Sequence, residues 1–370
     1  MTTGIKKKVL IAGASGLVGH AALREFEHDL DWEVVGVSRR APESPGRATH
    51  IPVDLLDKDR CAEVFGQMSD VTHLMYGAVN EDPTNLIVGW RDRERMALNQ
   101  TMLENLFEPL SSVANLEHVS LMQGTKAYGG VAGIEVGYTY RERAPRVEHD
   151  NFYFLQEDYL RGKQAGQPWS WTILRPVLIL GDAVGSNLNI LMVIGVYAAL
   201  RKEAGLPLTF PGDEHRPTEL VDSDLLARVL KWAATAPGAR NEIFNVANGD
   251  IVAMSDLYAV IAEEMGMELG PPEPSSFVTE LPKQADAWAA IVRKYDLAAP
   301  EDLMAVVGGS MELADTRRPA QSEDPPRRTG GHSSTIRLRQ AGFHDCMDSE
   351  DSVRKWFRRF HELRLLPPVD

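Results

Sequence analysis

A glycine-rich turn near the N-terminus is the feature that most restricts how this chain can fold. Gly13, Gly16 and Gly19 follow an apolar run at 9–12 and stand at the start of a helical pattern. Glycines between a strand and a helix let backbone amides and the helix N-terminus approach a pyrophosphate group closely. The turn therefore predicts an N-terminal βαβ unit that binds a dinucleotide.

The pattern that follows this turn predicts the fold class. Short β-branched runs alternate with longer helical patterns up to about residue 180, as in a parallel sheet covered by helices. The expected strands are 8–12, 33–38, 48–53, 72–76, 116–121 and 170–175, and the expected helices are 17–27, 62–67, 91–110 and 152–165. Residues 1–180 are therefore predicted to form an α/β, Rossmann-type doubly wound parallel sheet.

The second half of the chain has a different pattern. Apolar periodicity predicts helices at 188–204 and 222–236, and one late strand, 242–247, is expected to return to the sheet. Residues 181–370 are otherwise predicted to form a smaller, mostly helical substrate-binding domain over the strand ends. Within it, residues 315–334 combine Arg pairs with Pro-Pro, Gly-Gly and Ser-Ser, which indicates a polar loop.

Composition excludes several classes of partner. The formal net charge of −14 opposes binding to nucleic acid and to anionic lipid. Cys61 and Cys346 lie far apart without a metal-binding spacing, so no disulfide framework and no metal site are expected. No stretch is long enough to span a membrane, and a reducing cytoplasm is the expected location.

The end of the second expected strand indicates which dinucleotide is bound. An Asp or Glu usually stands there for the ribose hydroxyls of NAD, but this chain has Ser38, Arg39 and Arg40. Two guanidiniums suit a 2′-phosphate, so NADP(H) is the predicted cofactor; the alternative is a solvated Arg pair. Asp54 and Leu55 are expected beside the adenine, and the Gly77–Ala78 pair beside the ribose and pyrophosphate.

The usual catalytic motif of short-chain dehydrogenases is Tyr-x-x-x-Lys, in which the ammonium lowers the pKa of the tyrosine. Tyr159 and Lys163 match it, but they fall within the helix expected at 152–165. We interpret them as a surface pair one helical turn apart. Tyr153 is followed at the same spacing by Glu157.

Four segments resemble a known family. They are GASGLVG at 13–19 with SRR at 38–40, MQGTKAYGG at 122–130, NFYFLQED at 151–158, and WTILRPVLILG with SNLN at 171–189. The chain resembles the progesterone 5β-reductase and iridoid synthase-like enone reductases, a divergent branch of the extended short-chain dehydrogenases. The resemblance implies that Lys126 and Tyr153 are the catalytic pair. The chain departs from the family pattern at Phe154, where tyrosine is usual, and at Gln123, where threonine is common.

The resemblance also implies a function and a wider set of cofactor contacts. NADPH is expected to give hydride to the β-carbon of an activated C=C while Tyr153 holds the conjugated carbonyl oxygen. Carbonyl reduction and a catalytically silent NADP(H) sensor stay open as alternatives. The expected partner is a small enone or carbonyl substrate, and a homodimer is considered. Further expected cofactor contacts are Ser15, Leu17, Gln123, Lys126, Tyr153, Pro176, Val177, Ser186, Asn187 and Leu188.

Overall fold

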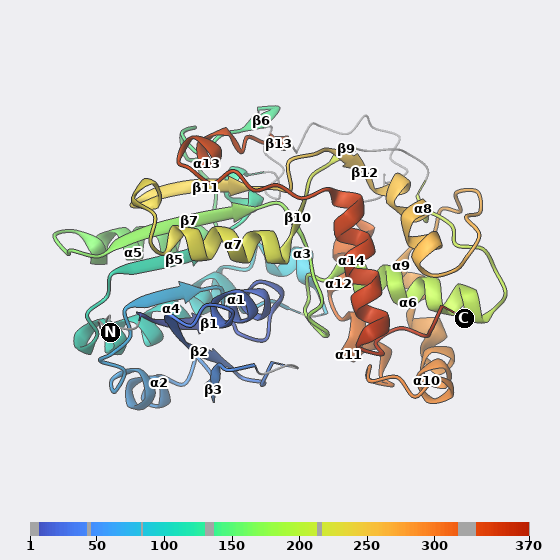
Figure 1. The fold of residues 1–370 in the computed structure, drawn as a ribbon, viewed down its shortest axis with the longest axis horizontal. Coiled ribbons are helices and arrows are strands. Elements are labelled where there is room, and N and C mark those ends of the chain that lie inside the picture. The colour runs from blue at the N-terminus through green and yellow to red at the C-terminus, as the bar shows by residue number, and fades with distance from the viewer. Residues whose placement is uncertain are drawn as a thin grey trace.

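A seven-stranded parallel sheet forms one half of the computed structural model (Figure 1). The structure describes residues 7–42, 46–82, 84–129, 137–212, 217–316 and 331–369. The strand order is β11-β7-β5-β4-β1-β2-β3. The strands are β1 (Lys7–Ala12), β2 (Trp32–Ser38), β3 (Thr49–Pro52), β4 (His73–Tyr76), β5 (His118–Met122), β7 (Ser170–Pro176) and β11 (Glu242–Val246). The order reverses at β1, so the sheet is doubly wound and the predicted α/β fold class is confirmed.

Successive side chains of each strand point to opposite faces of the sheet, and both faces are buried. In β1, Val9 and Ile11 point toward one face, while Leu10 and Ala12 point toward the other. The first face is covered by α1 (Leu17–Glu27) and α7 (Ser223–Ala233). The second face is covered by α2 (Lys58–Phe65), α4 (Arg93–Val113) and α5 (Phe152–Gln164). Such two-sided burial is typical of parallel strands and explains their continuous apolar runs.

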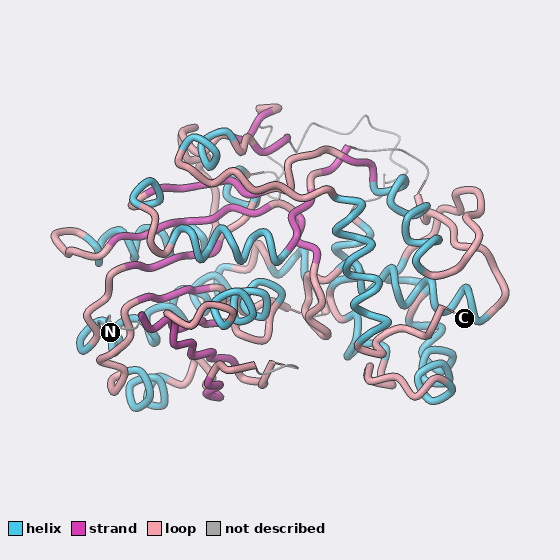
Figure 2. The backbone as a smooth tube through the Cα atoms, viewed as in Figure 1, coloured by secondary structure: helices cyan, strands magenta, loops and turns pink. Residues whose placement is uncertain are grey.

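The other half of the molecule consists mainly of helices and the loops that join them (Figure 2). Its centre is α6 (Ile190–Glu203), in which residues 190–200 are all buried. An apolar core surrounds this helix and is shared with α8 (Met254–Glu264), α10 (Ala285–Lys294), α11 (Leu303–Val307), α12 (Ser310–Asp315) and α14 (Ser349–Glu362). A helix that is buried all round belongs in a core, which accounts for the unbroken apolar sequence of α6.

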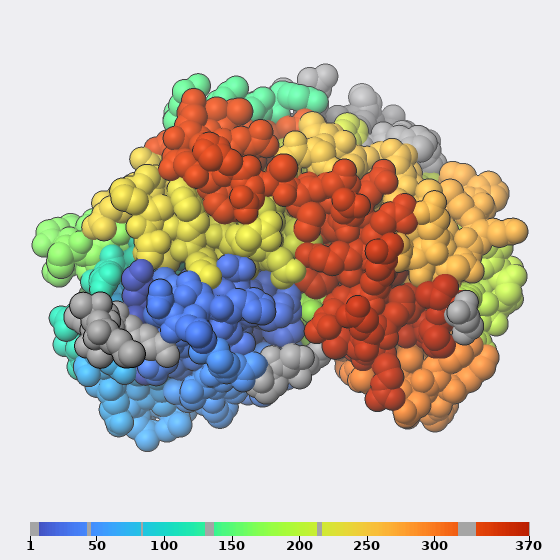
Figure 3. All heavy atoms as spheres, in the orientation of Figure 1, coloured from blue at the N-terminus to red at the C-terminus, as the bar shows by residue number. Residues whose placement is uncertain are grey.

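The chain crosses between the two halves more than once. Strand β11 returns to the sheet edge beside β7, and α7 packs on the sheet with α1. In Figure 3 the C-terminal segment, coloured red, extends over both halves on the visible face. The division at residue 180 stays a prediction, and the second half of the chain contributes to both cores.

Short elements complete the fold. The paired strands are β8 (Leu178–Leu180) with β10 (Leu220–Asp222), β9 (Pro217–Thr218) with β12 (Val252–Ala253), and β6 (Thr139–Tyr140) with β13 (His332–Ser333). The short helices are α3 (Leu86–Gly89), α9 (Phe277–Glu280), α13 (Ile336–Gln340), and the 3₁₀ turns η1 (Thr125–Tyr128), η3 (Pro237–Ala239) and η4 (Pro282–Gln284). Most of the predicted polar loop, residues 317–330, lies outside the described residues. No helix in the described part of the chain has the length and apolar character needed to cross a membrane.

Candidate active site

A pocket of about 160 Å³ opens at the carboxyl ends of the central strands. It contains the predicted cofactor contacts Gly13, Ser15, Gly16, Ser38, Arg39, Arg40, Asp54, Leu55 and Ala78. Its remaining lining residues are Val37, Val53, Gly77, Val79, Asn80 and Met102. Ligands of doubly wound sheets bind at this edge, beside the strand where the order reverses. The pocket therefore has the position that a dinucleotide requires.

The glycine turn is built for a close approach of backbone to ligand. Gly13 has a φ of +84°, and a β-carbon there would stand 2.8 Å from the carbonyl carbon of Gly77. A β-carbon on Gly19 would overlap the carbonyl oxygen of Gly13, so α1 packs directly on the turn. Gly16 is the N-cap of α1 and has no side-chain capping bond. Backbone amides at this N-terminus are thus left to bind an anion.

Arg39 and Arg40 stand at the rim of the pocket with exposed side chains. Neither guanidinium has an ion-pair partner among the described residues. Arg40 lies near Gly185, in the segment between β8 and α6: a β-carbon on Gly185 would be 3.4 Å from one guanidinium nitrogen. Ser38 is fixed by hydrogen bonds to His50 and to the carbonyl of Arg40. Two unpaired guanidiniums beside a hydroxyl suit a phosphate group.

A second cluster, Tyr153 and Lys126, lies at the same edge of the sheet. Lys126 is on η1, directly after β5, and Tyr153 is on the first turn of α5. Asn151 joins them, because its side chain accepts a hydrogen bond from the Tyr153 amide at 3.0 Å and donates to the Lys126 carbonyl at 3.1 Å. The Lys126 ammonium lies 5.3 Å from the centre of the Tyr153 ring. Two residues that are distant in the sequence are therefore held together.

This pair is largely closed to solvent. Tyr153 is 8% exposed, and its burial, together with the charge of Glu81, raises the pKa of its hydroxyl. Burial lowers the pKa of Lys126, whereas Glu81 acts in the opposite direction. The tyrosine consequently stays protonated at neutral pH and is available as a hydrogen-bond donor.

Gln123, a predicted cofactor contact, directs its buried side chain toward the protein. Its amide nitrogen donates to the Tyr153 carbonyl at 3.0 Å and to Glu157 at 3.1 Å, and its oxygen accepts from Arg175 at 2.8 Å. Glu157 is itself buried between Arg146, Arg161 and Arg175. This network fixes the first turn of α5 to β7, so the side chain of Gln123 supports Tyr153.

Tyr159 and Lys163 lie apart from the site. The Tyr159 hydroxyl donates to Glu108 at 2.7 Å, and the Lys163 ammonium binds the same carboxylate at 2.6 Å. Lys163 is 41% exposed, and Tyr159 packs against Phe107 of α4. Both side chains are thus occupied on the outer side of the α4–α5 helix pair.

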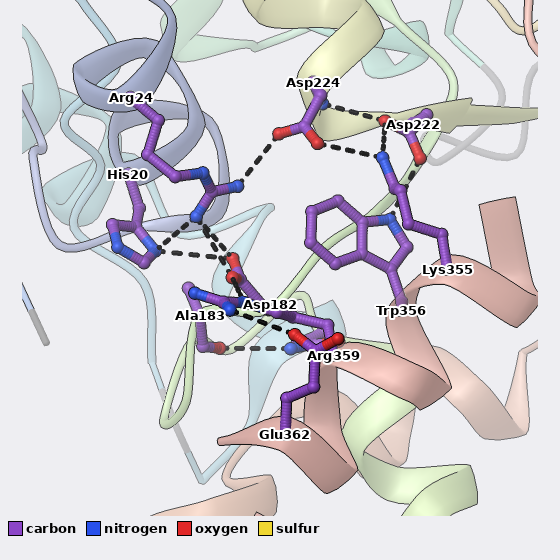
Figure 4. Close-up of polar contacts among 11 residues, drawn as sticks. His20, Arg24, Asp182, Ala183, Asp222, Asp224, Lys355, Trp356, Arg359 and Glu362 are labelled. Carbon is purple, nitrogen blue, oxygen red and sulfur yellow. Dashed lines mark hydrogen bonds and ion pairs between the residues drawn. The ribbon is translucent and has the colours of Figure 1, made fainter. Parts of the chain in front are cut away.

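The last group of predicted contacts lies outside the pocket lining. Pro176 ends β7, and Val177 donates from its backbone to Val246. Residues 186–188 lie between β8 and α6, where the carbonyl of Ser186 accepts a hydrogen bond from Ser310. Asp182 anchors this segment to α1 through Arg24, at 3.0 Å, and His20, at 3.4 Å (Figure 4). The contact of Pro176, Val177 and residues 186–188 with a cofactor stays a prediction.

Sequence reasoning missed several lining residues of the pocket. Asn80 was detectable as a polar residue shortly after a strand end, and its amide binds Asn99 of α4. Met102 comes from α4, and its spacing in the sequence gives no signal that it reaches this pocket.

The fold and the family relatives place this chain among the nicotinamide-dependent oxidoreductases of the extended short-chain dehydrogenase class. Residues 58–308 match the PRISE-like Rossmann-fold domain, and the chain belongs to this family. The resemblance expected from the sequence is thereby confirmed.

Relatives and solved structures agree with this assignment. The chain is 33% identical over 311 residues to an (S)-8-oxocitronellyl enol synthase of Antirrhinum majus, covering 78% of this chain and 77% of that protein. It is 35% identical over 281 residues to a 3-oxo-Delta(4,5)-steroid 5-beta-reductase of Arabidopsis thaliana, covering 70% and 69%. UDP-glucose 4-epimerase of Thermotoga maritima superposes with a TM-score of 0.67 at 14% identity, covering 96% and 99%. That last likeness is one of fold.

Proposed function

We propose that this chain is an NADPH-dependent reductase that transfers hydride to the β-carbon of an activated C=C, with Tyr153 holding the conjugated carbonyl oxygen. The observation that carries the proposal is the pairing of Tyr153 with Lys126 at the sheet edge that also forms the nucleotide pocket. The family relatives, among them a steroid 5-beta-reductase, support the reaction class. The substrates in the names of these relatives are substrates of those proteins, and none of them is assigned to this chain.

The residues present fit NADPH. The glycine turn and the open N-terminus of α1 would hold the pyrophosphate, and Arg39 and Arg40 would hold the 2′-phosphate. Asp54 and Leu55 would line the adenine side. When bound, the cofactor supplies the hydride.

Tyr153 and Lys126 would stabilise the charge that develops on the substrate. Negative charge grows on the carbonyl oxygen as the β-carbon gains hydride, and a fixed donor at that oxygen lowers the barrier. The Tyr153 hydroxyl is buried and protonated, so it can donate without reorganisation. Lys126 places a positive charge next to the same ring and would support that hydroxyl.

The regiochemistry of a simple reaction tests the proposal. The purified chain is incubated with cyclohexenone and NADPH that carries deuterium at the transferable position of the nicotinamide. We expect cyclohexanone with deuterium at the β-carbon, measured by gas chromatography and mass spectrometry. An allylic alcohol would instead support carbonyl reduction, and the absence of NADPH oxidation with NADPH still bound would support the silent sensor.

A further inference from the structure

The environment of the Lys126 ammonium contains a carboxylate that the reaction scheme does not yet use. Glu81, from the loop after β4, places one carboxylate oxygen 3.7 Å from the Lys126 ammonium. The same oxygen accepts a hydrogen bond from the Trp90 indole at 3.0 Å. The Glu81 side chain is 5% exposed and that of Lys126 is 15% exposed. A buried carboxylate and a buried ammonium thus form an ion pair next to the catalytic tyrosine.

Aromatic rings surround the rest of the ammonium. Its nitrogen lies 4.1 Å from the centre of the Trp90 ring, 5.3 Å from that of Tyr153 and 5.5 Å from that of Phe152. Ring faces attract a cation, but they replace only part of the hydration that burial removes. Among the described residues, Glu81 is the carboxylate that forms an ion pair with Lys126. A buried amine without such a counter-charge releases its proton more easily.

The loop that carries Glu81 also forms the nucleotide pocket. Residues 77–80 line that pocket, and Asn80 is fixed by two hydrogen bonds with Asn99 of α4. Glu81 is the next residue, and its carboxylate pairs with Lys126. One loop therefore serves both the nucleotide pocket and the catalytic pair.

We propose that Glu81 is a positioning residue whose carboxylate holds Lys126 in its charged form beside Tyr153. Its link to catalysis rests on the proposed function. Other charged or titratable groups around the pair are His149, whose ring binds the Lys126 carbonyl, and Arg175 on β7, which acts on Tyr153. Neither places a negative charge at the ammonium, so Glu81 provides the counter-charge.

The experiment compares Glu81→Gln with the wild-type protein. The glutamine oxygen can still accept the Trp90 hydrogen bond, so the variant removes the charge and little else. The pH dependence of Lys126 acetylation by acetic anhydride, read by peptide mass spectrometry, reports the protonation of this amine without requiring turnover. We expect its midpoint to fall by roughly 1 to 3 pH units. The alkaline limb of kcat should move to lower pH with it.

Asp82→Asn is the matched control. It removes a carboxylate from the same loop, but that carboxylate binds Thr84 and Arg95. In this variant, the midpoint of Lys126 acetylation and the midpoint of the alkaline limb of kcat should both stay at their wild-type values. An unchanged acetylation midpoint in Glu81→Gln overturns the inference, whatever the activity does. A shifted midpoint with an unchanged kcat profile would keep the Glu81–Lys126 coupling and would overturn the role of Lys126 in the proposed function.

Stability provides a second test that does not depend on Glu81→Gln alone. Lys126→Met leaves the Glu81 carboxylate buried without its cation, and an unpaired buried charge is destabilising. The double variant Lys126→Met with Glu81→Gln should therefore melt at a higher temperature than Lys126→Met. A double variant that melts at the same or a lower temperature would contradict the ion pair.

Discussion

The Tyr153 hydroxyl lies 3.2 Å from the position that a β-carbon would occupy on Gly124. The φ of Gly124 is −179°, an extended conformation that any residue adopts. A side chain at this position would therefore press on the tyrosine hydroxyl, whereas the backbone conformation itself allows any residue. The carbonyl oxygen of Pro176 lies 3.6 Å from the same point, so an added β-carbon would also contact the backbone of β7.

Gly124→Ala tests this approach. The added methyl group should displace the Tyr153 hydroxyl by a few tenths of an ångström and lower kcat roughly three- to thirty-fold, because catalysis depends steeply on the position of the donor. NADPH affinity and melting temperature should change little. Gly162→Ala is the control, since nothing lies within 4 Å of its β-carbon position on α5. Wild-type kcat in Gly124→Ala would show that the hydroxyl tolerates the shift or does not act.

Replacing both Arg39 and Arg40 by alanine should remove most of the preference for NADPH over NADH. Each charge-assisted hydrogen bond to a phosphate contributes on the order of 1.5 to 3 kcal/mol, so the ratio of kcat/KM values should fall by at least about tenfold. Arg60→Ala, which removes an exposed arginine that pairs with Glu63 on α2, is the control for losing an arginine outside the pocket. Equal use of NADH by the unmodified protein would refute the predicted cofactor.

The sequence predicts the sheet better than it predicts the helical half. The strands of the sheet are short and mostly apolar, and the turn with Gly13 marks the first one, so strands are expected close to all seven observed positions. Helix α2 begins at Lys58, four residues before the apolar pattern at 62, because the Asp57 side chain caps it by accepting from the Arg60 amide. The prediction did not include α8, α10 or α14, whose buried side chains belong to the same apolar core as α6.

The candidate site also has a part that the sequence predicts and a part that it does not. Residues at strand ends, such as Arg39 and Asp54, meet in one pocket because their strands are neighbours in a parallel sheet. Glu81 carries no such signal, since nothing in its sequence context separates it from Asp82. Only the folded loop shows that one carboxylate faces Lys126 and the other faces Arg95.

Tyr159 and Lys163 are expected to be dispensable for turnover although they match Tyr-x-x-x-Lys. Both are engaged by Glu108 on the outer side of α5. Tyr159→Phe and Lys163→Met should each keep kcat within about twofold of the wild type. Each substitution should lower the free energy of unfolding by at most about 1 kcal/mol, the usual contribution of an exposed pair. A loss of turnover comparable to that of Tyr153→Phe would restore this pair as the catalytic one.

Asp182 should make the stability of the protein depend on acid pH. Burial opposes its ionisation, but the hydrogen bond with His20 and the charge of Arg24 outweigh burial and lower its pKa to about 2 (Figure 4). A carboxyl group whose pKa is depressed on folding stabilises the protein above its unfolded pKa of about 3.9, and this stabilisation is lost as pH falls toward 2.

Asp182→Asn should consequently lower the free energy of unfolding by roughly 2 kcal/mol at pH 7. The difference from the wild type should shrink between about pH 4 and pH 2, as measured by urea denaturation. Asp31→Asn, at an exposed position, is the control. A difference that is constant with pH would mean that Asp182 acts through packing alone.

The proposed function depends most directly on the separate roles of Tyr153 and Lys126. Tyr153→Phe removes one oxyanion donor and keeps the ring, so kcat with cyclohexenone should fall roughly 10² to 10³-fold while NADPH affinity stays close to normal. Lys126→Met should also lower kcat, and it should weaken NADPH binding if the ammonium contacts the nicotinamide ribose. A purely structural role predicts a lower melting temperature with unchanged turnover per folded molecule. Wild-type turnover in Tyr153→Phe would remove the tyrosine from the mechanism.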